Sequence, residues 1–149
     1  MTTAAFDVQI ADWARQHDVL SEIRYAVFVE EQGVPLALEL DDLDRDPSAV
    51  VHVIANSVDG AAIGTARMLL EDGMARVGRM AVLQTWRGQG VGMQMLDALC
   101  KNAKQRRYSK VRLYAQTHAA QFYRKQGVAP VGEEFNEAGI THIEMRRTL

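Results

Sequence analysis

RVGRMAVLQTWRGQGVG, residues Arg76 to Gly92, is the stretch that decides the fold of this chain. It opens with strand-forming residues, passes through a polar turn, and ends in three glycines spaced two apart, Gly88, Gly90 and Gly92. Apolar side chains then recur at helical spacing, at Val91, Met95, Leu96, Leu99 and Ala103. The pattern predicts a strand, a glycine-rich loop and a helix in direct succession.

A glycine-rich loop before a helix is a suitable place for a phosphate group. The first amides of a helix have no internal partner and lie at the positive end of the helix dipole, so they attract anions. Glycine lets the backbone approach an anion closely, and Arg87 adds a fixed cation with a forked set of donors. A tight turn without a ligand is the alternative that the spacing alone leaves open.

Two common phosphate-binding motifs do not match this loop. The G-x-G-x-x-G motif of dinucleotide-binding proteins would need a glycine three residues after Gly90, where the chain has Met93. The Walker A motif would need a G-K-[ST] triplet, which the sequence does not contain. The segment instead matches R-x-x-G-x-G, at Arg87, Gly90 and Gly92.

The composition is that of an ordinary globular protein. The chain has 149 residues, of which 48% are hydrophobic and 24% charged, and we expect a single domain over residues 1–149. A net charge of -2 gives no electrostatic reason to expect nucleic acid or an anionic membrane as a partner. Neither a membrane-spanning run nor a secretory signal is recognisable, so we expect a cytoplasmic protein. The single cysteine, Cys100, is expected to be a small core residue.

Hydrophobic patterns predict the other elements. We expect a strand at 6–10, a helix at 16–30, strands at 49–58 and 61–70, and a further strand leading into the glycine loop. A helix at 90–106 and a parallel strand at 111–116 would form a right-handed crossover. A helix at 118–126 and strands at 128–135 and 140–147, joined by a turn at 136–139, would complete the chain. The predicted fold is α/β: a mixed, mostly antiparallel twisted sheet with helices on both faces.

Acidic residues stand out in two places. Glu30 and Glu31 end the predicted first helix, where negative charge is slightly unfavourable. They form either a solvated helix end or part of a functional site. The stretch from 36 to 47 contains five acidic residues, Glu39, Asp41, Asp42, Asp44 and Asp46. It is either a solvated loop or a mouth that attracts a cationic amine. His52 is expected to be a strand residue without a chemical role.

The glycine loop resembles the acyl-coenzyme A loop of the GNAT superfamily of N-acetyltransferases, whose pattern is Q/R-x-x-G-x-G/A. Other segments resemble, in order, the ElaA-like branch of that superfamily: IRYAVFVEEQGVP at 23–35, LELDDLD at 38–44, LYAQTHAAQFYRKQGV at 113–128, and the ending EEFNEAGITHIEM. The resemblance covers nearly the whole chain. An ordered set of segments is far more specific than any one motif.

The resemblance implies where acetyl-CoA would bind. In GNAT proteins the strand before the glycine loop and the next parallel strand separate at their carboxyl ends, and the pantetheine arm enters the gap. By position, the arm would contact Met80, Ala81 and Val82, and the pyrophosphate would contact Arg87, Gly88, Gln89, Gly90, Val91 and Gly92. A cofactor contact is also implied for His118, where many relatives have asparagine. No metal is implied.

The reaction implied is direct transfer of an acetyl group from acetyl-CoA to a primary amine of a small molecule or peptide. A lysine-like amine has a pKa of about 10 and must lose its proton, and a thiolate of pKa about 8.5 must leave. Tyr123 coincides with the catalytic tyrosine of the superfamily and is predicted to be the acid, with a buried core tyrosine as the alternative. Glu31 is predicted to be the base through water, although His118 and His142 have more suitable ordinary pKa values. A strand amide near Val82 is the candidate donor to the oxyanion.

Two other interpretations remain at this stage. In the first, the chain is a non-catalytic acyl-CoA-binding regulatory module. In the second, which the sequence favours less, it is a nucleotide-binding protein unrelated to acyl transfer. An exposed strand of the closing hairpin could also pair with a second copy and form a homodimer.

Overall fold

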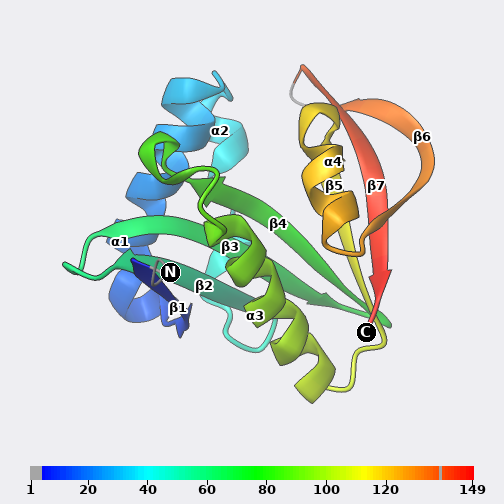
Figure 1. Ribbon diagram of the computed structural model, residues 1–149, viewed down its shortest axis with the longest axis horizontal. Coiled ribbons are helices and arrows are strands. Elements are labelled where there is room, and N and C mark those ends of the chain that lie inside the picture. The colour runs from blue at the N-terminus through cyan, green and yellow to red at the C-terminus, as the bar shows by residue number, and fades with distance from the viewer. Residues whose placement is uncertain (1–4, 138) are drawn as a thin grey trace.

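The computed structural model describes residues 5–137 and 139–149. It contains one seven-stranded sheet in the order β1-β2-β3-β4-β5-β7-β6 (Figure 1). The strands are β1 (Phe6–Ala11), β2 (Val50–Ser57), β3 (Ala62–Glu71), β4 (Met74–Val82), β5 (Lys110–Gln116), β6 (Ala129–Glu137) and β7 (Ile140–Thr148). The α-helices are α1 (Trp13–Arg24), α2 (Leu36–Glu39), α3 (Val91–Gln105) and α4 (Ala120–Lys125). The π-helix η1 (Tyr25–Glu31) and the 3-10 turns η2 (Asp42–Arg45), η3 (Gln84–Trp86) and η4 (Thr117–Ala119) lie between them.

Strands β1 to β4 form the antiparallel meander that the sequence predicts. Phe6 lies opposite Ser57, and Val50 lies opposite Leu69. Gly60 (φ +91°) and Gly73 (φ +74°) take the left-handed conformation in the two turns that follow β2 and β3, which glycine adopts without strain.

Helices cover both faces of this meander, as predicted. On one face α3 contributes Met95, Leu96 and Leu99 to the main core. On the other face Ile23 of α1 and Val27 of η1 pack against Ala81 of β4. Cys100 is buried in the main core, as expected for a small core residue. The mixed, mostly antiparallel sheet with helices on both faces is therefore confirmed.

The sheet divides between β4 and β5. These strands are parallel, but they pair only where Ala75, Arg76 and Val77 lie opposite Val111, Arg112 and Leu113. Strand β5 continues its pairing with β7 on the other side as far as Gln116. In Figure 1 the two halves of the sheet meet near the C-terminus and diverge toward α2 and α4. The structure thus contains the separation of strands that the resemblance implies.

The first helix differs from its predicted range of 16–30. Helix α1 begins at Trp13 because the carboxylate of Asp12 accepts a hydrogen bond from the amide of Ala14 (3.1 Å) and caps the helix. Beyond Arg24 the helix widens into η1, where the amide of Gln32 donates to the carbonyl of Val27 (3.2 Å). Such π-helical turns are frequent at functional sites.

The acidic stretch, expected to be a loop or a charged mouth, contains the short elements α2 and η2. Ala138, in the predicted last turn, lies outside the described residues. Within residues 5–137 and 139–149, every helix is too short or too polar to cross a membrane.

Candidate active site

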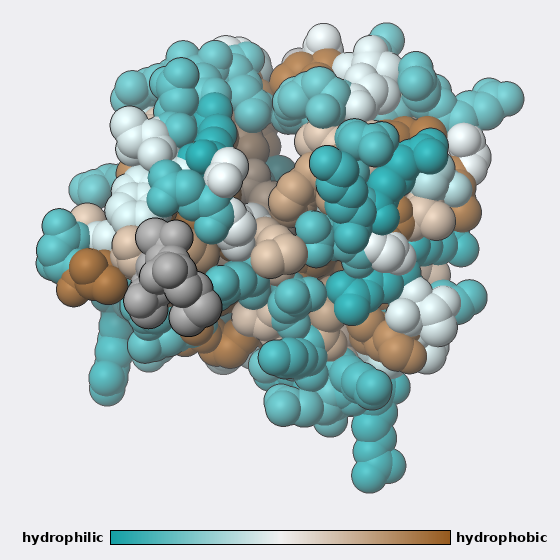
Figure 2. Space-filling view, in the orientation of Figure 1, coloured by the Kyte–Doolittle hydropathy of each residue, from teal (hydrophilic) through white to brown (hydrophobic). Residues whose placement is uncertain are grey.

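A cleft of about 890 Å³ lies between the two halves of the sheet. Figure 2 shows it as a hollow in the upper part of the molecule. Most of the predicted site residues line this cleft: Glu31, Met80, Val82, Arg87, Gly88, Gly90, Val91, Gly92, His118 and Tyr123. Segments far apart in the sequence are thus brought to one place.

Two predicted cofactor contacts have side chains that lie elsewhere. Ala81 is buried beneath η1, because successive residues of a strand point to opposite faces of the sheet. The side-chain amide of Gln89 donates to the carbonyl of Thr85 (3.2 Å) and does not line the cleft. A contact through either residue would therefore involve only its backbone.

The start of α3 forms an open cradle at one side of the cleft. Its N-cap residue is Gly90, at φ +87°, and no side chain in the described part of the chain caps the helix. Gly88 is also left-handed (φ +77°), and a Cβ placed there would meet nothing within 4 Å. Because the first amides of a helix have no internal partner, this arrangement fits an anion such as a pyrophosphate.

Gly92 has a different reason to be glycine. A Cβ at this position would lie 3.1 Å from Cζ of Phe122 on α4. The absence of a side chain therefore lets α4 pack against the first turn of α3. Packing between helices, as well as room for an anion, explains this third glycine.

Where β5 separates from β4, the edge of β4 presents backbone groups to the cleft. The amide of Leu83 donates to the carbonyl of Ile63 in β3 (2.9 Å). Since the amides of successive residues point to opposite edges of a strand, the amide of Val82 faces the gap. The carbonyl of Val82 accepts a hydrogen bond from Nε of Arg87 (2.9 Å). The Val82 amide is thus placed to donate to a group inside the cleft.

Arg87 and Glu31, predicted for different roles, form an ion pair with each other. The guanidinium donates from Nη1 and Nη2 to the two carboxylate oxygens, at 2.6 and 2.7 Å. These hydrogen bonds lower the pKa of Glu31 and raise that of Arg87. A carboxylate with a lowered pKa is a weaker base, so the pairing disfavours the predicted role of Glu31 in accepting a proton.

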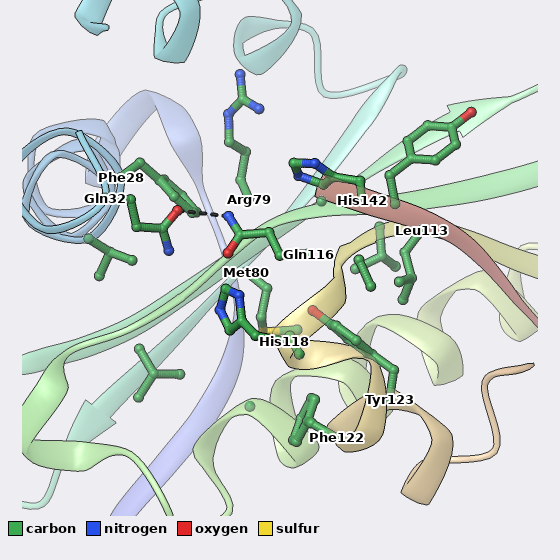
Figure 3. A pocket seen from close by; sticks show the side chains of 18 of the residues that line it. Phe28, Gln32, Arg79, Met80, Leu113, Gln116, His118, Phe122, Tyr123 and His142 are labelled. Carbon is green, nitrogen blue, oxygen red and sulfur yellow. Dashed lines mark hydrogen bonds between the residues drawn. The ribbon is translucent and has the colours of Figure 1, made fainter. Parts of the chain in front are cut away.

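Tyr123 lies in the wall opposite β4. The residue is 8% exposed, and burial raises its pKa to about 12. Its hydroxyl makes no hydrogen bond to the described residues, and Figure 3 shows it directed into the cleft toward Met80. The phenol is therefore neutral near pH 7 and carries a proton that it can donate.

Two histidines line the same cleft. His118 is exposed on η4, whereas His142 of β7 is buried. Nδ1 of His142 lies 2.7 Å from the carbonyl oxygen of Ile140. Because a carbonyl can only accept, Nδ1 carries a proton, and in the neutral ring Nε2 then has a free lone pair.

Two glutamines that the sequence analysis did not assign to the site connect the walls of the cleft. The side-chain amide of Gln116, at the end of β5, donates to Oε1 of Gln32 after η1 (2.8 Å) (Figure 3). Both residues lie within the segments that carry the family resemblance, which is the one signal that the sequence offered. Their pairing across 84 positions depends on the tertiary fold.

The acidic stretch is only in part a solvated loop, and of its five acidic residues only Glu39 lines the cleft. Arg24 donates to Glu39 (2.5 Å) and to Asp44 (3.0 Å), and both carboxylates are buried. Arg67 donates to Asp44 (2.9 Å) and, with two nitrogens, to Asp41 (2.9 and 2.8 Å). Glu39, Asp41 and Asp44 are therefore paired with arginines, while Asp41, Asp42 and Asp46 stay exposed. The expectation of a solvated loop thus holds for part of the stretch, and the rest is a buried ion-pair network.

Comparison with known proteins agrees with this geometry. The model of the acetyltransferase (GNAT) domain family matches residues 37–149. The uncharacterized N-acetyltransferase YjcF of Bacillus subtilis is 37% identical over 127 residues, which are 84% of this chain and 87% of YjcF. The crystal structure of an acyl-CoA N-acyltransferase from Pseudomonas aeruginosa has a TM-score of 0.83 and 31% identity, covering 95% of this chain and 99% of that one.

The ElaA protein of Escherichia coli is similar both in sequence and in structure. The sequences are 35% identical over 135 residues, 87% of this chain and 86% of ElaA. The ElaA crystal structure has a TM-score of 0.83 and covers 95% of this chain and 99% of that one, at 29% identity. These matches support acyl transfer from a coenzyme A thioester as the general activity. The chain belongs to the GNAT superfamily of N-acetyltransferases, in the branch that includes ElaA.

Proposed function

We propose that this protein transfers an acetyl group from acetyl-CoA to a primary amine of a small molecule or peptide, directly and within a ternary complex. One observation carries the proposal: the sheet opens between β4 and β5 directly beside the uncapped start of α3. An extended thiol arm and an anionic head group need these two features side by side. When bound, acetyl-CoA supplies a thioester whose carbonyl carbon the amine attacks.

The residues that would bind acetyl-CoA lie at the start of α3 and along the walls of the cleft. The amides of Val91 and Gly92 and the guanidinium of Arg87 would hold the pyrophosphate. Met80 and the free edge of β4 would lie along the pantetheine arm, with His118 near it on the opposite wall. The inward-facing amide of Val82 would donate to the carbonyl oxygen as negative charge develops there.

The proton on the leaving sulfur would come from Tyr123. Its raised pKa of about 12 keeps the hydroxyl protonated, and the hydroxyl has no competing partner among the described residues. A thiolate with a pKa of about 8.5 ends protonated at neutral pH, so a positioned donor assists its departure.

The proton on the attacking amine would go to His142, directly or through a water molecule. Its Nε2 has a free lone pair because Nδ1 is held by the Ile140 carbonyl. Glu31, which the sequence predicts for this role, instead pairs with the guanidinium of Arg87. His118 is the remaining alternative on geometry, because it also lines the cleft.

The test is an assay of free thiol release from acetyl-CoA with a panel of amines, polyamines and peptides. We expect Tyr123→Phe to lower kcat by about 10² to 10⁴, the usual contribution of a positioned acid, with little change in coenzyme A affinity. Phe122→Tyr adds a hydroxyl at the neighbouring position and is not expected to restore the rate in a Tyr123→Phe background. A protein that binds coenzyme A but releases no thiol with any amine would instead be an acyl-CoA-binding module.

A further inference from the structure

Arg79 occupies an unusual backbone position at the point where the sheet opens. Thr65 of β3 lies opposite Ala81, whereas Arg67 lies opposite Gly78, so β4 contains one extra residue there. Arg79 sits in this bulge with φ +52°. A long side chain rarely adopts this conformation, and such outliers concentrate at functional sites.

The guanidinium of Arg79 has few good hydrogen bonds. Its Nη2 donates to the carbonyls of Leu38 (3.3 Å) and Glu39 (3.2 Å) and to Asp41 (3.4 Å), all of them long. Its Nε is buried without a partner among the described residues. Nη1 also makes no hydrogen bond to these residues and, unlike Nε, is not enclosed by protein atoms. The side chain is 28% exposed and lines the cleft.

The carboxylates near Arg79 are already committed to other arginines. Oε1 of Glu39 lies 3.7 Å from Nε of Arg79 but 2.5 Å from Nε of Arg24. Asp41 lies 3.4 Å from Arg79 but accepts a hydrogen bond of 2.8 Å from Arg67. Arg79 is therefore the least well paired arginine of this network.

The cleft side of this region has an excess of positive charge. On β4, Arg76 shares the carboxylate of Glu71 with Arg112 of β5. Together with the network above, five arginines share four carboxylates: Arg24, Arg67, Arg76, Arg79 and Arg112 with Glu39, Asp41, Asp44 and Glu71. Burial, followed by the charges of Arg67 and Arg24, lowers the pKa of Arg79. An anion at Arg79 would relieve this repulsion.

Arg79 lies in a part of the cleft that is separate from Tyr123. In Figure 3, Arg79 and His142 are on one side of the Gln32–Gln116 hydrogen bond, and His118 and Tyr123 are on the other. Phe28, Leu38 and Tyr114 supply apolar surface to the cleft. The remaining cleft-lining carboxylate, Glu137, is 61% exposed to solvent and lies 4.0 Å from Nε2 of His142.

We propose that Arg79 binds a carboxylate of the acceptor, so that the substrate is a primary amine bearing a carboxylate, such as an amino acid or a short peptide. The proposal rests on the proposed acyl transfer and reverses the expectation of a purely cationic acceptor. The carboxylate would accept from Nη1, and the apolar side chains would contact the rest of the molecule. Arg79 would thereby determine specificity without taking part in proton transfer.

The experiment compares amines that differ only by the carboxylate. Rates of thiol release are measured with phenylalanine and phenethylamine, lysine and cadaverine, and a glycyl-phenylalanine dipeptide. We expect wild type to prefer a carboxylate-bearing acceptor by at least about tenfold in kcat/KM, the effect of one hydrogen bond between charged groups. Arg79→Gln should abolish the preference and leave coenzyme A affinity unchanged. The dipeptide distinguishes a free amino acid from a peptide terminus.

Arg112→Gln is the matched control. Arg112 is on the neighbouring strand, is 25% exposed and also has a buried Nε without a partner, but it does not line the cleft. The preference should survive in this variant. Arg79→Lys keeps the positive charge with fewer donors and should retain part of the preference. Partial retention would show that the loss in Arg79→Gln does not come from a folding defect. Equal or better use of phenethylamine and cadaverine by wild type would overturn the proposal and leave acyl transfer intact.

If wild type acetylates none of these amines, a binding measurement tests the anion site at Arg79. In that case the proposed transfer to them fails, and N-acetylphenylalanine and N-phenethylacetamide are titrated by calorimetry into the protein saturated with coenzyme A. N-acetylphenylalanine should bind at least about tenfold more tightly than N-phenethylacetamide, and this difference should disappear in Arg79→Gln. That result would support the anion site. Equal binding of the two compounds would overturn it.

Discussion

At the level of single residues, the ion pair between Arg87 and Glu31 joins a predicted phosphate-binding residue to a predicted base. Both side chains are partly exposed, at 40% and 39%, and an exposed pair contributes only about 0.2–1 kcal/mol. A pyrophosphate carries more charge than one carboxylate and would also contact the helix amides. Arg87 can therefore exchange Glu31 for the cofactor, or bind both, at small cost.

We expect Arg87→Glu to weaken coenzyme A binding by about tenfold to a hundredfold, because a charge-assisted hydrogen bond is replaced by repulsion. Calorimetric titration measures the affinity. In the charge-swapped double variant, Glu31→Arg with Arg87→Glu, the ion pair is restored but its position is reversed. Recovery of full affinity in the double variant would mean that the pair, rather than the cation at position 87, is what matters.

Glu31 and His142 are separated by their different effects on rate. Glu31→Gln should leave kcat nearly unchanged and raise coenzyme A affinity by up to about fivefold, because it releases Arg87. His142→Gln should lower kcat by about 10² or more. Steady-state kinetics between pH 5.5 and 9 measure both. The opposite result, with a large loss only in Glu31→Gln, would return the role of base to Glu31.

At the level of elements, the contact between α3 and α4 connects the proposed cofactor cradle to the hydroxyl of Tyr123, the proposed acid. Gly92 faces Phe122, and the Phe122 ring lies 5.0 Å from the Tyr123 ring at an interplanar angle of 75°. Helix α4 has six residues and is too short to be stable by itself. Its position, and with it that of Tyr123, depends on packing against β5, β6 and the first turn of α3.

We expect Gly92→Ala to lower kcat while the melting temperature changes little. The new Cβ, 3.1 Å from Phe122, would push α4 outward, while alanine gains about 1 kcal/mol over glycine inside a helix and offsets the strain. Thiol release and thermal unfolding measure the two effects. Adding Phe122→Leu should make room and restore much of the rate; a Gly92→Ala variant with wild-type kcat would show that α4 adapts freely.

At the level of the whole molecule, the buried arginine network attaches the acidic stretch to the sheet. His52 of β2 belongs to it, since its Nε2 lies 3.1 Å from the Asp44 carbonyl and its ring stacks on Trp13 at 4.7 Å. The expectation that His52 is a satisfied strand residue is confirmed. Because a buried charged group that loses its partner is strongly destabilising, by about 3–5 kcal/mol, the network must form as a unit.

His52 makes the stability of the fold depend on pH. Burial is the main cause of its lowered pKa, so the unfolded chain binds a proton, with a pKa of about 6.5, before the folded protein does. Stability should therefore fall as the pH drops below about 6.5, until the lowered pKa of the folded state is reached. We expect the melting temperature of His52→Gln to change less between pH 7 and pH 5 than that of wild type. His17 is an exposed histidine on α1, and His17→Gln should keep the wild-type pH dependence. An unchanged slope in His52→Gln would contradict this assignment.

The sequence by itself determined the order of elements, the glycine loop and the family. These depend on local patterns: alternation in the strands, helical spacing after Gly90, and the R-x-x-G-x-G motif. It did not determine the start of α1, because the cap by Asp12 carries no apolar signal, nor the π-helix η1, whose hydrogen-bond pattern no residue type requires.

Only the tertiary structure decided which charges meet. Arg87 pairs with Glu31 across 56 positions, and Arg67 pairs with Asp41 across 26. A charged residue in a sequence has many possible partners, and the energy of each pair depends on distance and burial, which the fold sets. For this reason the acidic stretch could not be recognised as a buried network from its composition, and the weakly paired Arg79 became visible only once its neighbours were in place.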